Sequence, residues 1–306
     1  MDFELAVVGA GPAGLTAGLY AERAGIKTIL IDKEDGGGLA AIAPSVENYP
    51  GFKSITGSEL MEKIKQHAKE YVETKFYEPV ENIEKQDEKF NIKTSEDSYT
   101  VGAVIIATGT KPRKLDVEGE EEFHGQGVSY CATCDGFFFK DKKVAVVGGG
   151  NSALIEAIYL KQIGCKEVYL IHRRDQLRAE EIYEKEAKEK NVEILFNKTV
   201  EKIQGDKKVE KVVLNDTKTG EKTPLDVDGV FISIGEIPQN ALAEKMNIKL
   251  DGRGYIKTDE EMRTNIKGVY AAGDITGGLR QIVTACSDGA KAGLSCTEVL
   301  GKQYPY

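Results

Sequence analysis

The sequence lacks the features that mark membrane proteins and nucleic-acid-binding proteins. No apolar run approaches the length of about 18 residues that a transmembrane helix requires. A basic surplus is also missing, because the net charge is −9 and the pI is about 5.2. Binding to a phosphate backbone needs a basic surface. We therefore expect no membrane span and no nucleic-acid partner.

Cysteine is scarce as well. The chain has five cysteines, an odd number, and three histidines among 306 residues. An odd set does not form the paired disulfide framework of a small secreted protein. The first residues, Met1 to Glu4, lack the basic segment that opens a signal peptide. We expect a cytoplasmic protein.

An internal repeat is the main feature that the sequence does contain. Each copy has an apolar strand, a glycine-rich turn, a helix and a second apolar strand. These segments are residues 5–8, 12–24 and 28–31, then residues 144–147, 152–163 and 168–171. Short buried strands that alternate with helices predict parallel sheets covered on both faces. The expected fold class is α/β, with two Rossmann-like three-layer nucleotide-binding domains.

The order of the elements predicts that one domain is inserted into the other. Apolar strands followed by Gly and then Pro close the two copies at residues 104–112 and 229–238, where we expect sharp turns. A later strand at residues 268–274 has no nucleotide loop of its own and returns most simply to the first domain. We expect a discontinuous domain of residues 1–112 and 246–306, and an inserted domain of residues 113–245.

Both copies carry a glycine-rich loop of the dinucleotide-binding type. The loops are Gly9-Ala10-Gly11-Pro12-Ala13-Gly14 and Gly148-Gly149-Gly150-Asn151-Ser152-Ala153. The glycines permit a tight turn and a close approach of the backbone to a pyrophosphate. The helix that follows offers free N–H groups at its N-terminus. Two such loops predict two bound dinucleotides.

The residues after the second strand of each copy distinguish the two ligands. Asp32 stands where an acid accepts hydrogen bonds from ribose hydroxyls, which fits FAD or NAD. The second copy has three arginines instead, Arg173, Arg174 and Arg178. Guanidinium groups suit the dianionic 2′-phosphate of NADPH. A solvated basic turn is the alternative for this segment.

A Cys131-Ala132-Thr133-Cys134-Asp135 segment lies between the two glycine loops. The two thiols could bind a metal, stabilise a turn or cycle between dithiol and disulfide. A zinc site needs four ligands, and the other cysteines and histidines are scattered, so we expect no metal. We therefore favour thiol–disulfide exchange, with Asp135 as proton donor or acceptor or, alternatively, as a helix cap. The adjoining residues 137–139, three phenylalanines, could form a partner surface or be buried.

These motifs together resemble those of the low-molecular-weight thioredoxin reductases, which are homodimeric FAD enzymes with an inserted NADPH domain. The resemblance covers nearly the full length. It is carried by both glycine loops and the Cys-Ala-Thr-Cys-Asp segment. It is carried also by Glu47-Asn48-Tyr49-Pro50-Gly51, Ala107-Thr108-Gly109, His172-Arg173-Arg174-Asp175, Gly273-Asp274 and Arg280-Gln281.

The resemblance implies specific site residues. The FAD site would be formed by Gly9, Gly11, Pro12, Ala13, Asp32, Lys33, Gly37, Gly38, Leu39, Asn48, Thr108, Gly109, Asp274, Arg280, Gln281 and Ile282. The NADPH site would be formed by Gly148, Gly150, Asn151, Ser152, His172, Arg173, Arg174, Arg178 and Gly235. By the same resemblance, Cys134 is the sulfur nearest the flavin, Cys131 attacks the partner's disulfide, and Asp135 is the acid/base.

Three positions depart from the family pattern. Leu39 follows Gly37-Gly38 where the family has Gln, which removes a possible side-chain contact to FAD. Asn151 replaces a more usual Asp at the start of the second helix. The segment from Gly273 to Gly277 lacks a second acid that is common there.

The sequence thus predicts a thioredoxin-disulfide reductase that passes electrons from NADPH through FAD and the dithiol to a thioredoxin-like protein. Alternative enzymes are a relative that uses ferredoxin or a deazaflavin as donor, and an FAD dithiol oxidase. A redox-sensing nucleotide-binding protein is the non-enzymatic alternative. Because the dithiol and the nicotinamide site share one inserted domain, we expect that domain to rotate between two states.

Overall fold

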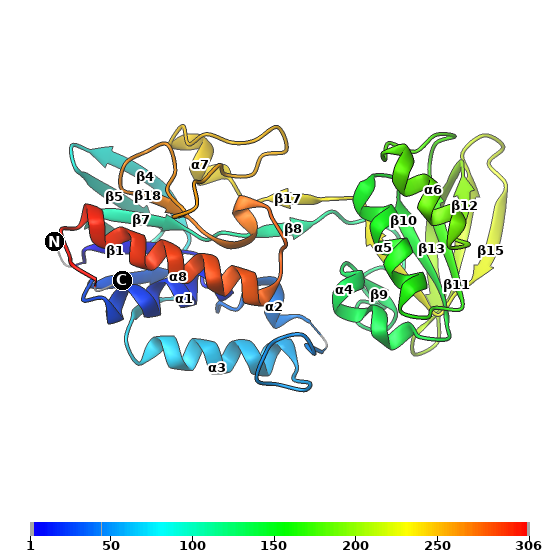
Figure 1. Cartoon of the computed structure of the whole chain (residues 1–306), viewed down its shortest axis with the longest axis horizontal. Helices are drawn as coiled ribbons and strands as arrows, with labels where there is room; N and C mark the ends of the chain where they lie inside the picture. The colour runs from blue at the N-terminus through cyan, green and yellow to red at the C-terminus, as the bar shows by residue number, and fades with distance from the viewer. Residues whose placement is uncertain (1–2, 44, 305–306) are drawn as a thin grey trace. The chain divides into compact units, whose positions relative to one another are not determined.

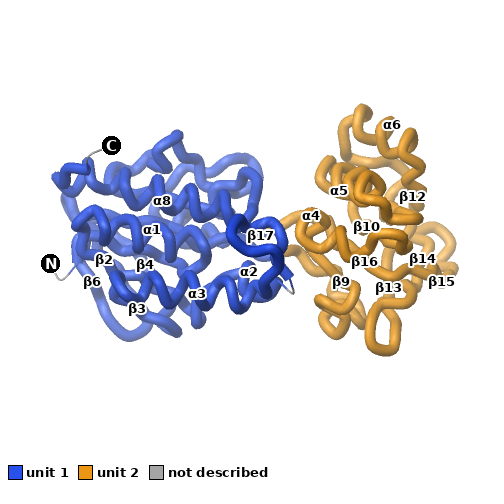
Figure 2. The backbone as a smooth tube through the Cα atoms, turned by 60° about the horizontal axis from the view of Figure 1, so that its bottom comes forward, with its two compact units in different colours: residues 1–111, 237–306 blue, residues 112–236 orange. Residues whose placement is uncertain are grey.

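The computed structural model describes residues 3–43 and 45–304, which form two compact units (Figures 1 and 2). Unit 1 contains residues 1–111 and 237–306, and unit 2 contains residues 112–236. The chain therefore returns to unit 1 at residue 237 and not at the expected residue 246. The reason lies in α7 (Ala241–Lys245), whose Ala243 is buried in a core cluster of unit 1.

Unit 1 is built on a parallel sheet of five strands. These are β1 (Leu5–Val8), β2 (Thr28–Ile31), β3 (Glu73–Lys75), β7 (Ala103–Ile106) and β18 (Val269–Ala271), in the order β18-β7-β1-β2-β3. Strand β18 pairs with β7, although more than 160 positions separate them in the sequence, as the bounds show. The late strand thus completes the first sheet.

The two faces of this sheet are covered by different layers (Figure 1). Leu5 and Val7 point into a cluster shared with α1 (Pro12–Arg23), α3 (Gly57–Lys69) and α8 (Ile282–Val299). Ala6 and Val8 point into a second cluster shared with the antiparallel strands β4 (Val80–Gln86), β5 (Lys89–Thr94) and β6 (Ser98–Val101). Because successive side chains of a strand point to opposite faces, an all-apolar strand requires a layer on each side.

Unit 2 repeats this plan. Its parallel sheet has the order β12-β11-β10-β16-β9, formed by β9 (Val128–Ser129), β10 (Lys143–Gly148), β11 (Glu167–His172), β12 (Glu193–Phe196) and β16 (Gly229–Ser233). One face packs against α5 (Asn151–Gln162) and α6 (Glu181–Glu189). The other face packs against the antiparallel strands β13 (Lys198–Gly205), β14 (Val209–Asp216) and β15 (Lys222–Asp226). The predicted α/β class with two three-layer domains is confirmed.

Two short strands form where the chain passes between the units. Strands β8 (Thr110–Pro112) and β17 (Glu236–Pro238) pair as a two-stranded sheet. The expected turns occur just before these strands, at Gly109 (φ +66°) and Gly235 (φ +100°). Glycine adopts such left-handed conformations without steric cost. After each turn the chain runs extended through a strand that ends in a proline, Pro112 or Pro238. Proline is tolerated here because both strands of a two-stranded sheet are edge strands.

Candidate redox and dinucleotide sites

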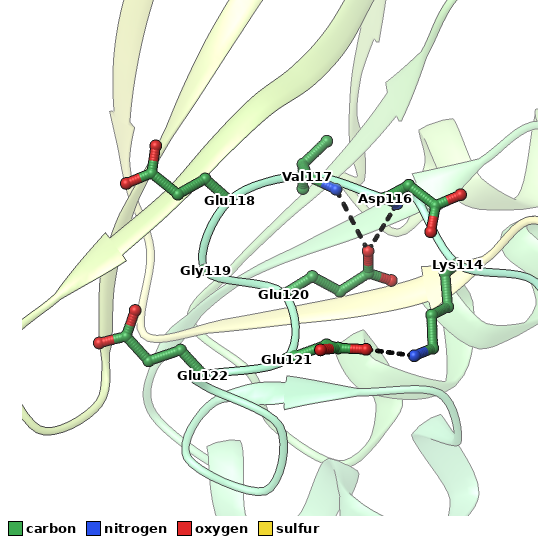
Figure 3. Close-up of a pocket in the computed structure, with 8 residues that line it drawn as sticks. All are labelled: Lys114, Asp116, Val117, Glu118, Gly119, Glu120, Glu121 and Glu122. Carbon is green, nitrogen blue, oxygen red and sulfur yellow. Dashed lines mark hydrogen bonds and ion pairs between the residues drawn. The ribbon is translucent and has the colours of Figure 1, made fainter.

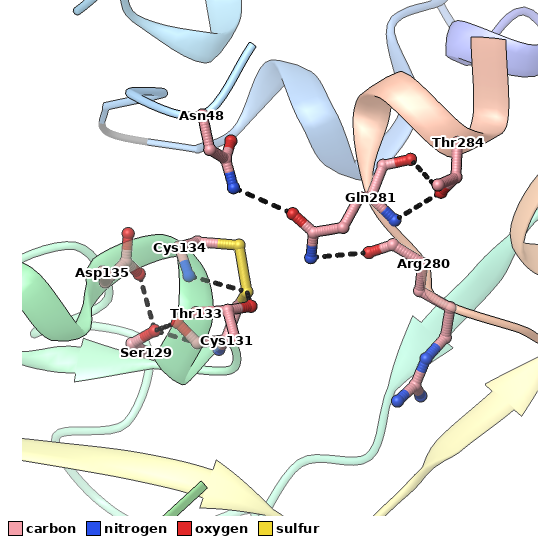
Figure 4. The surroundings of a disulfide bond; sticks show 9 residues. All are labelled: Asn48, Ser129, Cys131, Thr133, Cys134, Asp135, Arg280, Gln281 and Thr284. Atoms are coloured by element: carbon pink, nitrogen blue, oxygen red, sulfur yellow. Dashed lines mark hydrogen bonds between the residues drawn. A yellow bond between two sulfur atoms is a disulfide. The ribbon is translucent and has the colours of Figure 1, made fainter. Parts of the chain in front are cut away.

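The two cysteines of the Cys-Ala-Thr-Cys segment form a disulfide at the start of a short helix in unit 2 (Figure 4). Cys131 is the N-cap of α4 (Ala132–Asp135), and the Cα atoms of Cys131 and Cys134 are 5.3 Å apart. The N–H of Cys134 points at the Cys131 sulfur, 3.2 Å away. This N–H therefore remains a hydrogen-bond donor for the Cys131 sulfur when the disulfide is open.

Asp135 ends the same helical turn, and its carboxylate is largely buried. The Ser129 hydroxyl donates to Asp135 Oδ2 over 2.6 Å, while the Oδ1 atom has no hydrogen-bond partner among the described residues. Burial raises the pKa of Asp135 above 3.8, against smaller lowering effects of the Ser129 bond and the nearby His124. A carboxyl group with a raised pKa and one oxygen that makes no hydrogen bond is suited to giving and taking a proton.

The three phenylalanines after Asp135 separate into two environments. They lie in the 3₁₀ helix η1 (Gly136–Phe139). Phe139 is buried and packs edge-on against Phe231 of the sheet, with ring centroids 5.2 Å apart. Phe137 and Phe138 are 64% and 41% exposed. Two exposed aromatic rings within a few residues of a disulfide form an apolar surface at the edge of the redox site.

The first glycine loop meets two distant segments of unit 1. A Cβ atom on Gly9 would lie 2.3 Å from the carbonyl oxygen of Ala107, which directly precedes Thr108 and Gly109. A Cβ atom on Gly273, the neighbour of Asp274, would lie 2.7 Å from the Cβ of Ala13. The glycines therefore permit backbone contacts that a side chain would block. Three of the segments assigned to FAD from the sequence lie together.

The entrance to α1 remains open for a phosphate group. Gly11 is the N-cap of α1 and makes no side-chain cap hydrogen bond, and a Cβ atom added to it would have no neighbour within 4 Å. Helix α1 therefore presents backbone N–H groups with space beside them, which fits the pyrophosphate of a dinucleotide.

Asp32 follows β2 and faces the same loop. Its Oδ2 accepts from the Ala10 N–H over 2.5 Å, and its Oδ1 accepts from the Glu34 N–H over 2.8 Å. Burial raises the pKa of Asp32, and the two backbone bonds oppose that effect. A carboxylate has about four lone-pair positions, so these two bonds leave capacity for ribose hydroxyls. Its neighbour Lys33 is exposed and lies 3.9 Å from the Glu34 carboxylate.

The remaining residues assigned to FAD lie in loops and helix starts of unit 1. Gly37 has a φ of +93° and precedes α2 (Gly38–Ala41), on which Leu39 is 40% exposed. The Asn48 amide donates to the Gln281 side chain over 2.9 Å, across 233 positions of sequence (Figure 4). Gln281 caps α8, Ile282 is its first residue, and Arg280 adopts a φ of +53°. Such a backbone conformation is uncommon outside glycine.

The second glycine loop has the same open entrance as the first. A Cβ atom on Gly148 would lie 2.5 Å from the Ser233 carbonyl oxygen, whereas one on Gly150 would meet no atom within 4 Å. Gly150 is the N-cap of α5, Asn151 its first residue and Ser152 the next, and the N-cap makes no side-chain hydrogen bond. This helix N-terminus also fits a pyrophosphate.

Asn151 binds back to the loop that carries the arginines. Its Oδ1 accepts from the Glu180 N–H over 2.9 Å, and its Nδ2 donates to the Glu180 carboxylate over 2.7 Å. An Asp at this position would accept the first bond but lacks the donor for the second. The departure from the more usual Asp therefore has a structural counterpart, because the two-way contact requires an amide.

The three arginines of the second site are exposed, whereas His172 is buried. Both nitrogens of the His172 ring face backbone carbonyl oxygens. The residues assigned to the NADPH site from this motif therefore differ in the structure: the histidine is buried and the arginines are exposed. Arg173, Arg174 and Arg178 face solvent, and His172 belongs to the frame beneath them.

Several other polar groups lie outside these sites. In the 114–122 loop of unit 2, the Glu120 carboxylate is buried and accepts from the N–H groups of Asp116 and Val117 (Figure 3). It also accepts from the Leu115 N–H and the Tyr130 hydroxyl. This carboxylate stabilises the loop.

Of the remaining cysteines, Cys165 and Cys296 are buried, as expected for small apolar residues, and Cys286 is half-buried. Among the described residues, no three His, Cys, Asp or Glu side chains gather as a metal site, and no helix is long and apolar enough to span a membrane.

Sequence reasoning missed three of the residues that organise these sites. Ser129 bonds to Asp135, Gly149 lies against His172, and Glu180 pairs with Asn151. Only Gly149 stands inside a motif that was read from the sequence. The other two are common polar residues whose importance comes from contacts formed on folding.

Comparisons with known proteins give a consistent result. Residues 3–289 match the family described as pyridine nucleotide-disulphide oxidoreductase. A protein of Treponema pallidum (strain Nichols), named thioredoxin reductase, is 45% identical over 297 residues, which cover 95% of each chain. The crystal structure of thioredoxin reductase from Streptococcus pyogenes MGAS5005 has a TM-score of 0.92 at 42% identity and 98% coverage of both chains. That of Lactococcus lactis thioredoxin reductase, described as the FR conformation, has a TM-score of 0.67 at 40% identity, covering 98% of this chain and 99% of that one.

Proposed function

The chain belongs to the pyridine nucleotide-disulphide oxidoreductase family, and we propose that it is a thioredoxin-disulfide reductase that uses NADPH, FAD and the Cys131–Cys134 dithiol. The observation that carries the proposal is the disulfide at the start of α4, with the part-paired carboxylate of Asp135 next to it. The relatives named thioredoxin reductase support it over 95% of the chain. The resemblance expected from the sequence is thereby confirmed.

The dithiol performs the exchange with the protein substrate. NADPH and FAD, when bound, supply the electron pair that opens the Cys131–Cys134 disulfide. The Cys131 thiolate attacks one sulfur of the substrate disulfide, which forms a mixed disulfide and releases the other substrate sulfur as a thiolate. The Cys134 thiolate then attacks the Cys131 sulfur, which restores the Cys131–Cys134 disulfide and releases the second substrate thiolate. The substrate gains two electrons, and its two thiolates take up two protons.

Asp135 takes part in the proton balance. Its Oδ1 atom is buried without a hydrogen-bond partner among the described residues, so we assign the transferable proton to that oxygen. Ser129 fixes the other oxygen, which orients the carboxyl group. The raised pKa of Asp135 makes its protonated form more available at a given pH than that of an ordinary carboxyl group.

Unit 1 fits FAD, and unit 2 fits NADPH. Each unit has an open, uncapped helix N-terminus at the end of a glycine loop. In unit 1, Asp32 offers remaining lone pairs to a ribose. In unit 2, exposed arginines stand where an acid would otherwise be, and guanidinium groups suit a 2′-phosphate. We keep the full assignment of site residues given by the sequence as part of this proposal, except that His172 acts beneath the arginines.

The protein substrate docks on the exposed rings of Phe137 and Phe138. Both rings follow the redox disulfide within four residues of Cys134, and aromatic residues are enriched at the centres of protein interfaces. Thioredoxin-like proteins are the partner class that the disulfide chemistry and the names of the relatives support.

A homodimer and a cytoplasmic location also belong to the proposal. Helices α1, α3 and α8 of unit 1 line an apolar groove with Leu19, Tyr20, Ile64 and Val283, and Tyr20 and Val283 are exposed. A second copy of the chain would cover such a face. Three cysteines outside the redox pair remain free thiols, which suits a reducing compartment.

Anaerobic titration of the purified flavoprotein tests the proposal. Addition of NADPH should bleach the flavin absorbance, and a thioredoxin should then be reduced with one equivalent of NADPH per disulfide. Absence of bleaching at micromolar NADPH, with bleaching by reduced ferredoxin or a reduced deazaflavin, would show that the electron donor is one of these and not NADPH. Oxygen consumption with a small dithiol would indicate a dithiol oxidase, and nucleotide binding without any disulfide reduction would indicate a sensor.

A further inference from the structure

His172 occupies an unusual position at the end of β11. Its side chain is 5% exposed, and its two ring nitrogens face two different loops. Nδ1 lies 2.8 Å from the carbonyl oxygen of Gly148 in the glycine loop. Nε2 lies 2.9 Å from the carbonyl oxygen of Gln176 in the loop that carries the arginines. One ring thus bridges the two segments expected to bind the nucleotide.

Gly149 provides the space for this ring. A Cβ atom on Gly149 would lie 2.1 Å from His172 Nδ1 and 2.2 Å from its Cε1. Gly149 does not have a positive φ, so its backbone would accept another residue. The requirement for glycine at this position is therefore set by the His172 ring.

Further hydrogen bonds fasten the same two loops around the ring. The N–H of Arg178 donates to the Gly149 carbonyl oxygen over 2.8 Å. Beyond it, Asn151 and Glu180 make their two-way contact. The segment from Arg173 to Glu180 is therefore tied to the glycine loop at its middle and at its end.

We propose that His172 is a positioning residue that fixes the arginine loop over the glycine loop and thereby sets the preference for a nucleotide with an adenosine 2′-phosphate. It acts through Arg173, Arg174 and Arg178 and does not itself touch the phosphate. Guanidinium groups discriminate by bidentate geometry, so their selectivity depends on a fixed loop. This inference rests on the proposed use of NADPH.

Two variants test the proposal by different routes. His172→Phe keeps a ring but removes both ring nitrogens, and Gly149→Ala keeps the histidine but displaces it. Gly252→Ala is the matched control, because a Cβ atom there meets nothing within 4 Å and Gly252 lies in unit 1. Calorimetric titration of each purified flavoprotein with 2′,5′-ADP and with 5′-ADP measures the preference for the 2′-phosphate without any turnover.

The preference is the dissociation constant of 5′-ADP divided by that of 2′,5′-ADP. We expect this ratio to fall about tenfold in His172→Phe and in Gly149→Ala, and to stay unchanged in Gly252→Ala. An unchanged ratio in either folded variant would overturn the positioning role. A wild-type protein that binds both probes equally would instead refute the proposed use of NADPH.

Discussion

The hydroxyl of Ser129 donates a 2.6 Å hydrogen bond to Asp135 Oδ2 and accepts another from the N–H of Cys131 over 3.0 Å. One side chain thereby connects the proposed acid/base to the backbone of the proposed nucleophile (Figure 4). The other carboxylate oxygen of Asp135 is buried and has no partner among the described residues. Ser129 therefore determines which oxygen of Asp135 is open for proton transfer.

Removal of the Ser129 hydroxyl should raise the pKa of Asp135 further, because the bond from Ser129 lowers it. In Ser129→Ala we expect the alkaline limb of the pH–rate profile for thioredoxin reduction, where the protonated form of Asp135 is lost, to move to higher pH. The rate at the wild-type optimum should fall about fivefold, since such a bond contributes about 1 kcal/mol. Ser129→Thr retains the hydroxyl and serves as the control. Identical profiles for the Ala and Thr variants would contradict the prediction.

Replacement of Asp135 by Asn should slow thioredoxin reduction by about two orders of magnitude, the usual contribution of a positioned acid/base. The same change should stabilise the fold by about 1 kcal/mol at pH 7, because an amide carries no charge to desolvate. A raised folded-state pKa means that the folded state binds more protons than the unfolded state at pH values above 3.8. The contribution of Asp135 to the free energy of unfolding should therefore fall as the pH rises through that range.

Melting temperatures of the wild type and Asp135→Asn, measured from pH 3.5 to pH 8, test the stability effect. The difference between the two proteins should be near zero at the acid end and should grow toward neutral pH. A difference that does not change with pH would show that burial of the Asp135 charge has no cost.

The two cysteines should give different products when each is replaced by serine. Cys134→Ser leaves the proposed nucleophile, Cys131, without its resolving partner. When oxidised thioredoxin is added, this variant should therefore accumulate a mixed disulfide between Cys131 and thioredoxin. Cys131→Ser should accumulate none, and both variants should retain FAD. Non-reducing gel electrophoresis with mass spectrometry measures the adduct. An adduct on Cys134 alone would reverse the two assignments.

Asn151→Asp should weaken the attachment of the arginine loop. The Asp side chain lacks the donor that Asn151 gives to the Glu180 carboxylate and places a second negative charge beside it. We expect a loss of about 1 kcal/mol in the unfolding free energy of unit 2. Glu180→Gln should be nearly neutral alone and should rescue the Asp variant, since Gln donates to Asp. A double-mutant cycle without coupling would rule out this interaction.

Gly289→Ala should be destabilising although it lies inside helix α8. An exposed helical glycine gains up to about 1 kcal/mol on replacement by Ala. Here a Cβ atom would lie 2.1 Å from the Ala13 carbonyl oxygen on α1. We therefore expect a loss of about 1 to 3 kcal/mol and weaker FAD retention, because Ala13 belongs to the first glycine loop. Gly252→Ala is again the control, and equal melting temperatures for all three proteins would refute the close contact.

The strongest local patterns predicted their elements closely. Strands β1 and β2 have the predicted bounds, and helix α1 (Pro12–Arg23) lies within the predicted range of residues 12–24. The antiparallel sheets β4–β6 and β13–β15 were not predicted, because their alternating apolar and charged residues carry no distinctive motif. The return of the chain at residue 237 also escaped prediction, since it depends on which core buries Ala243.

The sequence by itself determined the two repeated units, the positions of both glycine loops and the cysteine pair, because each of these depends on residues adjacent in the chain. Only the tertiary structure decided which backbone atoms the glycines face, that Ser129 bonds to Asp135, and that His172 lies beneath the arginines. His172 and Gly148 are 24 positions apart, Gly9 and Ala107 are 98 apart, and Asn48 and Gln281 are 233 apart. Hydrogen-bond partners at such separations are chosen by packing, which local sequence patterns do not specify.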